Sequence, residues 1–143
     1  MKKTTVVLVY ILALFIFSCK EEKKDVAPVE RTQMQQVMDI HDEVMPKMGV
    51  LGSLARKMKG KADTTAIGLK YSAAQEDLEA AHTEMMDWMT GFGERFDSSE
   101  IMKGKALTEQ KQKWLNEEEA KVKALRKHIN SSIARAETLL EEQ

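Results

Sequence analysis

Apolar residues in the middle of the chain recur at alternating steps of four and three, and no other sequence feature limits the fold as strongly. In an α-helix this spacing places the residues on one face, whereas a half-buried β-strand needs an apolar residue at every second position. The residues are Ile67, Tyr71, Ala74, Leu78, Ala81, Met85, Trp88 and Phe92. They predict a long helix that buries one stripe against neighbouring helices.

Similar stripes lie before and after this segment. The earlier stripe consists of Val37, Ile40, Val44, Leu51, Leu54 and Met58, and the later one of Leu115, Val122, Leu125, Ile129, Ala136 and Leu140. We therefore predict an all-α fold, a three-helix up-down-up bundle in which an antiparallel hairpin precedes a long C-terminal helix. The only cysteine is Cys19, so packing without a disulfide must hold the folded part together.

The predicted first helix covers residues 31–59. Pro46 removes one backbone donor inside it, so we expect a kink within 44–49, with a break into two helices as the alternative.

The second helix is predicted over residues 65–92, after polar capping residues, with Gly91 and Gly93 closing it. The connection over 93–107 has room for one helical turn. Thr108 is the predicted cap of the third helix.

Charged residues of both signs are mixed along the chain. The three glutamates at 117–119 precede Lys121 and Lys123, which predicts ion pairs on the solvent face of the third helix. The formal net charge is −1, and it becomes −3 without Lys2 and Lys3. A nucleic-acid partner is not expected, because binding to phosphates needs a basic face.

The N-terminus has the pattern of a secretion signal. A lysine pair precedes twelve apolar residues at 6–17, which is a short run for a membrane-spanning helix. Residues 16–19, Ile-Phe-Ser-Cys, resemble the lipobox of bacterial lipoproteins, in which a peptidase cuts before a lipidated cysteine. We expect residues 1–18 to be removed and Cys19 to be acylated, with an uncleaved signal anchor as the alternative.

A polar segment follows the cysteine. We expect residues 19–30 to form the lipidated end and a flexible tether, and residues 31–143 to form the helical domain. Lys20, Glu21 and Glu22 resemble the signal that sends Bacteroidetes lipoproteins to the outer face of the outer membrane. The alternatives are a solvated tether without a signal and a protein that faces the periplasm. In each of these cases the acyl chains on the cysteine would make the bilayer a partner.

Methionine and histidine form a second stripe on the first helix: Met34, Met38, His41, Met45 and Met48. A helix in a three-helix bundle faces two partners, and methionine is a flexible filler for a second seam. Thioether sulfur and imidazole nitrogen are also suitable ligands for Cu(I). The candidate copper ligands are Met38, His41, Met45 and His82.

Motifs that would indicate catalysis are not visible in the sequence. It has no glycine-rich phosphate loop, no Gly-x-Ser-x-Gly and no His-Glu-x-x-His. Glu79 and His82 have the Glu-x-x-His spacing of di-iron bundles, but His41 and His128 lack the second copy that such a site requires. We therefore expect a protein that is not an enzyme, with neither a cofactor nor a small-molecule substrate identified.

Three segments resemble a family of small Bacteroidetes lipoproteins of unknown function that carry the label "viral A-type inclusion protein". They are His-Asp-Glu-Val-Met-Pro-Lys-Met at 41–48, Met-Met-Asp-Trp-Met at 85–89, and Leu-Thr-Glu-Gln-Lys-Gln-Lys-Trp at 107–114. The resemblance implies a lipoprotein of the outer membrane and no particular activity.

The sequence thus favours an outer-membrane lipoprotein that acts as a structural or interaction module, with a protein of the envelope as its partner. The expected partner surface is the end formed by residues 92–107, because long loops often carry function. The alternative is a periplasmic or surface copper-binding protein.

Overall fold

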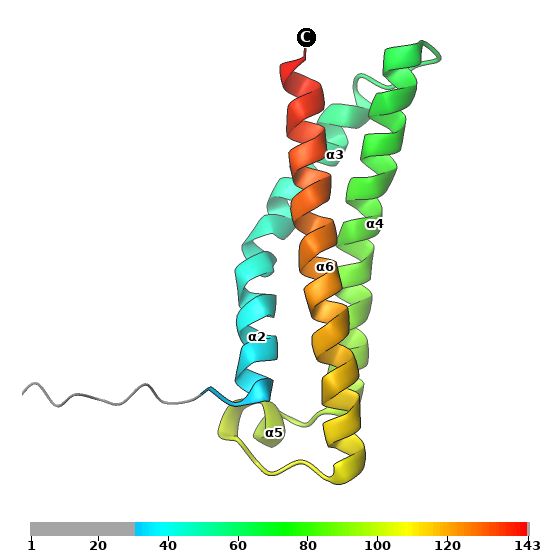
Figure 1. Cartoon of the computed structure of the whole chain (residues 1–143). Helices are drawn as coiled ribbons and strands as arrows, with labels where there is room; N and C mark the ends of the chain where they lie inside the picture. Colours follow the sequence, from blue (N-terminus) through cyan, green and yellow to red (C-terminus); the bar gives the residue numbers. More distant parts are fainter. Residues whose placement is uncertain (1–30, 143) are drawn as a thin grey trace, which may run out of the picture. The chain divides into compact units, whose positions relative to one another are not determined.

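The computed structural model describes residues 31–142 as a bundle of helices (Figure 1). The elements in chain order are α2 (Gln33–Val44), the 3₁₀ helix η1 (Met45–Lys47), α3 (Met48–Lys59), α4 (Ala66–Arg95), α5 (Ser98–Lys103) and α6 (Glu109–Glu141). No strand occurs in this part of the chain, and none of its helices is both long and apolar enough to cross a bilayer. The predicted signal, Cys19 and the tether lie outside the described residues.

The three long helical segments alternate in direction. The α2–η1–α3 segment runs one way, α4 returns, and α6 runs parallel to the first segment (Figure 1). α6 packs against α2, α3 and α4, while α4 packs against α3 and α6. The predicted all-α, up-down-up bundle is therefore confirmed, with α5 as a short addition.

The first helix is divided at Pro46, where the 3₁₀ turn η1 separates α2 from α3; this corresponds to the alternative of a break into two helices. Proline supplies no N–H for the bond to the carbonyl four residues earlier, and the chain adopts the tighter 3₁₀ turn of η1 there. α2 consequently packs against α6, whereas α3, beyond the turn, packs mainly against α4.

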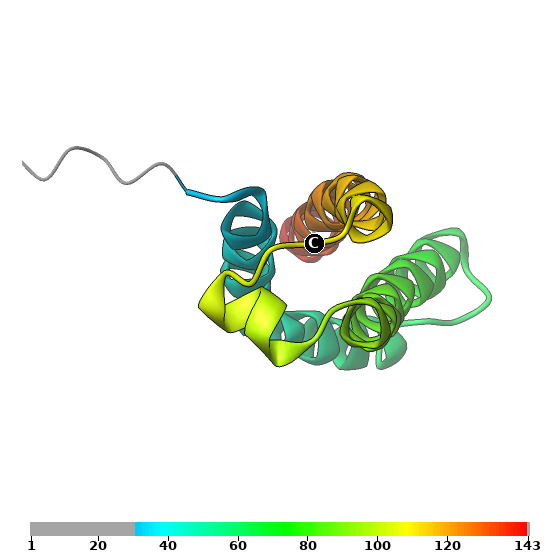
Figure 2. The ribbon, with the colours of Figure 1, turned by 90° about the horizontal axis from the view of Figure 1, so that it is seen from below.

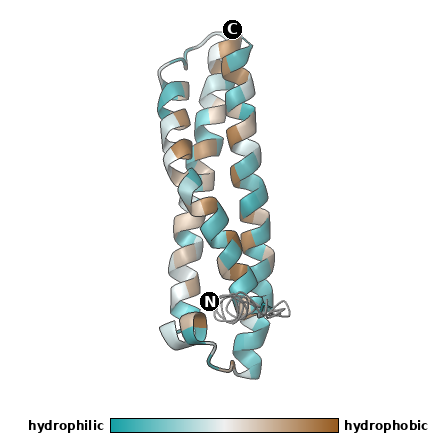
Figure 3. Ribbon diagram, turned by 90° about the vertical axis from the view of Figure 1, so that its left-hand side faces the viewer, coloured by the Kyte–Doolittle hydropathy of each residue, from teal (hydrophilic) through white to brown (hydrophobic). Residues whose placement is uncertain are grey.

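The core consists of the predicted stripes. All six residues of the first stripe are buried, as are Tyr71, Leu78, Ala81, Met85, Trp88 and Phe92 of the second and five of the six in the third. Brown, apolar segments recur along each long helix in Figure 3. Ala74 and Leu140 are partly buried against the core, and only Ile67, in the first turn of α4, is exposed, at 46%.

The end of α4 differs from the prediction. Gly91 and Gly93 do not close the helix, which continues to Arg95. Each glycine costs a helix about 1 kcal/mol relative to alanine, but the aromatic rings of Phe92 and Phe96 are buried and packed together at a centroid distance of 4.8 Å. Tertiary packing therefore outweighs the low helix propensity of the two glycines.

The connection after α4 contains the expected helical turn as α5. Its start is a capping box, in which Asp97 accepts from the N–H of Ser99 and of Glu100, and Glu100 accepts from the N–H of Asp97. A hydrogen bond from Lys105 lowers the pKa of Asp97 to about 2. α5 lies across one end of the bundle (Figure 2), where the buried Glu100 accepts from Lys111 Nζ at 2.6 Å.

The start of α4 depends on a glycine. Thr65 is the N-cap and accepts from the N–H of Gly68, while Asp63 Oδ1 accepts from the N–H of Thr65 at 2.8 Å. Asp63 lies directly against the α-carbon of Gly68, so a β-carbon there would approach the Asp63 nitrogen to 2.6 Å. The turn between α3 and α4 therefore has no room for a side chain at this position.

We predict that Gly68→Ala destabilises the bundle by about 1–3 kcal/mol, because the turn must shift to admit the methyl group. Gly93→Ala is the matched control: its β-carbon meets nothing within 4 Å, and it should stabilise α4 by up to about 1 kcal/mol. Urea denaturation followed by circular dichroism measures both. Equal effects of the two substitutions would contradict this description of the turn.

Candidate functional site: a groove between α4 and α6

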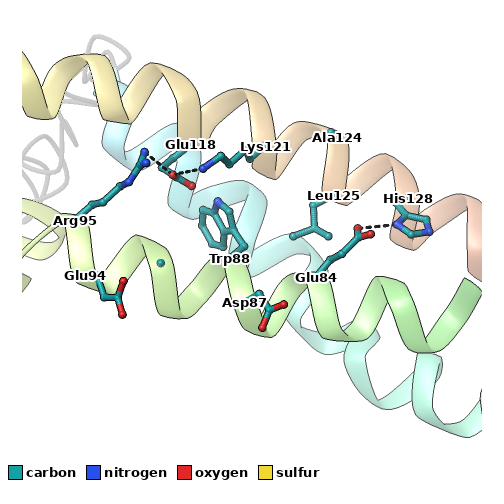
Figure 4. Close-up of a pocket in the computed structure, with 11 residues that line it drawn as sticks. Glu84, Asp87, Trp88, Glu94, Arg95, Glu118, Lys121, Ala124, Leu125 and His128 are labelled. Carbon is teal, nitrogen blue, oxygen red and sulfur yellow. Dashed lines mark hydrogen bonds and ion pairs between the residues drawn. The ribbon is translucent and has the colours of Figure 1, made fainter.

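A groove of about 760 Å³ lies between α4 and α6 (Figure 4). Ligand sites in proteins commonly have volumes of this order. Gly91 on α4 and Ala124 on α6 both line it, and these small residues leave space between the helices. A β-carbon on Gly91 would meet nothing within 4 Å, so the groove reaches the backbone of α4 there.

The apolar part of the groove is formed by Trp88 and Leu125, which are 8% and 6% exposed. The Trp88 ring packs against Phe92, with a centroid distance of 4.9 Å. Its Nε1 is buried and has no hydrogen-bond partner. Figure 4 shows the indole between the two helices, with its nitrogen-bearing edge toward α6. A buried donor without an acceptor is unfavourable by about 1–3 kcal/mol, so this N–H is a natural point of attachment for a ligand oxygen.

Glu118 brings a carboxylate into the groove, although it is only 2% exposed. It forms ion pairs with Arg95 Nη1 and Lys121 Nζ, each at 2.9 Å. Arg95 also pairs with Glu117 at 2.7 Å, and its guanidinium lies 5.4 Å from the centre of the Trp114 ring. The buried charge is thus neutralised from both helices.

This burial corrects the expectation that the three glutamates at 117–119 lie on the solvent face. Glu119 does pair with Lys123, four residues later. Lys121, in contrast, pairs with the buried Glu118 three residues before it. Only part of the predicted pattern of surface ion pairs is therefore present.

At the other end of the groove, His128 joins α6 to α4. Its Nδ1 lies 2.8 Å from Glu84 Oε2, and its Nε2 lies 3.2 Å from Asp77 Oδ1. The hydrogen bond with Glu84 raises the pKa of His128, partial burial lowers it and Asp77 raises it further, so the net pKa lies above the usual value of 6.5. Asp77 also pairs with Arg135. His128 is therefore positioned to hold the two helices together when it is protonated.

Two further carboxylates line the α4 side of the groove. Asp87 and Glu94 are exposed, and within residues 31–142 neither has an ion-pair or hydrogen-bond partner. The groove therefore combines an apolar floor, an unpartnered N–H and two carboxylates that are available to a ligand.

The methionine stripe of the first helix packs against the core, as the second-seam interpretation predicts. Met38, Met45 and Met48 are partly buried against it. The His41 ring lies 6.0 Å from the Trp88 ring, and its Nδ1 is 2.9 Å from Asp42 Oδ1. His41 therefore occupies the edge of the core and faces α4.

His82, the fourth candidate copper ligand, lies elsewhere. It lines a surface hollow between α3 and α4 together with Ala55 and Arg56. The His41 ring lies beside Trp88 with its plane tilted by 32°, and Trp88 follows His82 by six residues on α4, or about 9 Å of helix rise. Among residues 31–142, no group of three His, Cys, Asp or Glu side chains is placed to hold a metal ion. Copper binding by Met38, His41 and Met45 stays a prediction from the sequence.

The end formed by residues 92–107 is largely packed into the bundle. Phe92 and Phe96 are buried, and Ile101 packs against the core. Met102, in contrast, is 78% exposed. Deleting this segment would uncover the core, so its role in binding must be tested by single substitutions such as Met102→Ser.

No protein-family model, curated protein or solved structure matches this chain. The resemblance to Bacteroidetes lipoproteins stays an expectation from the sequence.

We predict that stability falls as the pH rises above about 6.5, because the raised pKa of His128 means that the folded state binds its proton more tightly than the unfolded state. The contribution is fully present below pH 6.5 and is lost as the pH passes the folded-state pKa. Thermal denaturation from pH 5 to 9 measures it. His128→Gln should flatten this slope and His82→Gln should leave it unchanged; an unaltered slope in His128→Gln would refute the assignment.

Proposed function

We propose that this chain is a lipid-anchored protein of the bacterial cell envelope, and that its helical bundle is a non-enzymatic binding module. The anchoring part rests on the sequence, in which a lysine pair, a twelve-residue apolar run and Ser18 precede Cys19. Two or three acyl chains on this cysteine would hold the protein at the outer membrane, since each buried methylene contributes about 0.8 kcal/mol.

The binding part rests on one observation, the buried Trp88 Nε1 without a partner in a groove of ligand size. Buried donors in native proteins are nearly always paired, so an unpaired one calls for an explanation, and a bound ligand is the one that we propose. The Leu125 side chain supplies apolar contact beside the indole, and Gly91 leaves the backbone of α4 accessible. We therefore place the binding site in the α4–α6 groove and not at the end formed by residues 92–107.

The anchor is tested by growing cells with an alkyne-bearing palmitate analogue. We predict that the wild-type protein becomes labelled and that Cys19→Ser does not, because serine offers no thiol for the diacylglycerol. Mass spectrometry of the wild type should show an acylated Cys19 as the first residue.

Replacing Lys20, Glu21 and Glu22 by alanine is the control for export. This triple variant should keep the label but lose accessibility to protease on intact cells. An unlabelled wild-type protein that begins at Met1 would overturn the anchoring proposal.

The groove is tested with N-phenyl-1-naphthylamine, a neutral apolar fluorophore. We predict saturable binding to the purified domain, lost in Gly91→Leu, because a leucine at this position fills the groove. Gly93→Leu is the matched control and should bind like the wild type, since Gly93 lies on the same helix outside the groove lining. Melting curves should show both variants at least as stable as the wild type, because neither β-carbon meets a neighbour. Absence of saturable binding, or equal loss in both variants, would refute the groove as the binding site.

A further inference from the structure

We propose that the α4–α6 groove binds an organic cation that carries an apolar chain and an oxygen acceptor for the Trp88 N–H. This inference rests on the proposed function and names the class of ligand for the same groove. Three independent features of the groove lead to it: the charges that remain unpaired, the chemistry of the floor, and the spacing along α4.

The basic groups of the groove are already paired. Arg95 and Lys121 both bind the Glu118 carboxylate, and Arg95 also binds Glu117. His128 lies against Glu84 and Asp77. An anionic ligand would have to share Arg95 or Lys121 with Glu118 and would lie near the carboxylates of Glu118 and Glu84, which is unfavourable because like charges repel.

Two acidic groups of the groove, unlike the basic ones, have no partner among the described residues. Asp87 and Glu94 line the groove without an ion-pair or hydrogen-bond partner in residues 31–142. A cation can pair with either of them without breaking an existing contact. The unpaired charge of the groove is therefore negative, and it favours a positively charged ligand.

The floor of the groove indicates two further features of the ligand, an apolar part and an oxygen acceptor. Trp88 and Leu125 offer apolar contact, and an indole also attracts a cation that lies near its ring. The Trp88 Nε1–H is a donor only, so it requires an oxygen acceptor such as an amide or ester carbonyl. A simple inorganic ion or a polyamine without an apolar part would leave this floor uncovered.

The spacing along α4 places these features next to one another. Asp87, Gly91 and Glu94 are separated by steps of four and three, so they share one face of the helix. The two carboxylates are about 10 Å apart along the helix axis, and the glycine lies between them. Asp87 and Trp88 are consecutive and do not face each other on the helix, but both line the groove, so one ligand can contact the indole and the carboxylate.

The experiment uses three amides that differ in charge: N-(3-aminopropyl)decanamide is cationic, N-propyldecanamide is neutral and N-decanoyl-β-alanine is anionic. Each is titrated below its micelle-forming concentration against the protein loaded with N-phenyl-1-naphthylamine. We expect the cationic amide to displace the fluorophore at a concentration at least about tenfold lower than the other two. This preference should diminish at high salt, because the carboxylates are exposed.

The double variant Asp87→Asn with Glu94→Gln removes the charges without removing a contact. It should bind the cationic amide about tenfold more weakly and the neutral amide as before. Glu137→Gln is the matched control, since this exposed glutamate lies on α6 and is not among the groove residues. It should leave all three affinities unchanged.

The outcomes separate the two proposals. If neither the fluorophore nor any of the three amides binds, the binding function of the groove is refuted. If the fluorophore binds and all three amides displace it equally, or if the double variant retains the preference for the cation, the groove binds ligands but the inference of a cationic ligand is wrong.

Discussion

The turn at Met45–Lys47 divides the first helical segment into α2 and α3, which pack on different faces of α4 and α6. Two long helices packed side by side, such as α4 and α6, form a groove on each flank. The bent first helix fills one of these grooves, because α2 packs against α6 and α3 packs against both α4 and α6. On the opposite flank lies the groove lined by Trp88 and Glu118, and among residues 31–142 only α4 and α6 line it. The turn at Pro46 allows the first segment to pack against α6 through α2 and mainly against α4 through α3.

The seam of α6 shows how far the sequence pattern could be followed. The apolar residues Leu115, Val122, Leu125, Ile129 and Ala136 were sufficient to predict the buried face of this helix, and all are buried. The pattern steps over positions 118 and 132, where a strict alternation of three and four would place further buried residues. Glu118 and Ser132 occupy these positions and are 2% and 1% exposed. The seam position of Glu118 was therefore a signal that its carboxylate is buried. This signal was missed because Glu117 and Glu119 on either side made the segment resemble a solvent face.

The groove itself depends on information that periodicity does not contain. The pattern predicts the stripes of α4 and α6, but not the register in which Arg95 meets Glu118 or His128 meets Glu84. It also predicts a buried Trp88, but not an indole nitrogen without an acceptor. The extension of α4 beyond Gly91 and Gly93 was missed for a related reason: local propensity favours an end there, and the buried aromatic contact with Phe96 continues the helix. Long-range packing decides each of these features.

The unpartnered N–H of Trp88 is the central element of the proposed binding site, and nuclear magnetic resonance observes it directly. In ¹⁵N-labelled Trp114→Phe protein, the remaining indole signal belongs to Trp88. We predict that N-(3-aminopropyl)decanamide shifts this signal downfield in a saturable manner, as the amide oxygen accepts the hydrogen bond. An indole signal that stays in place while the amide binds would show that the ligand does not meet Trp88 and would contradict the proposed site.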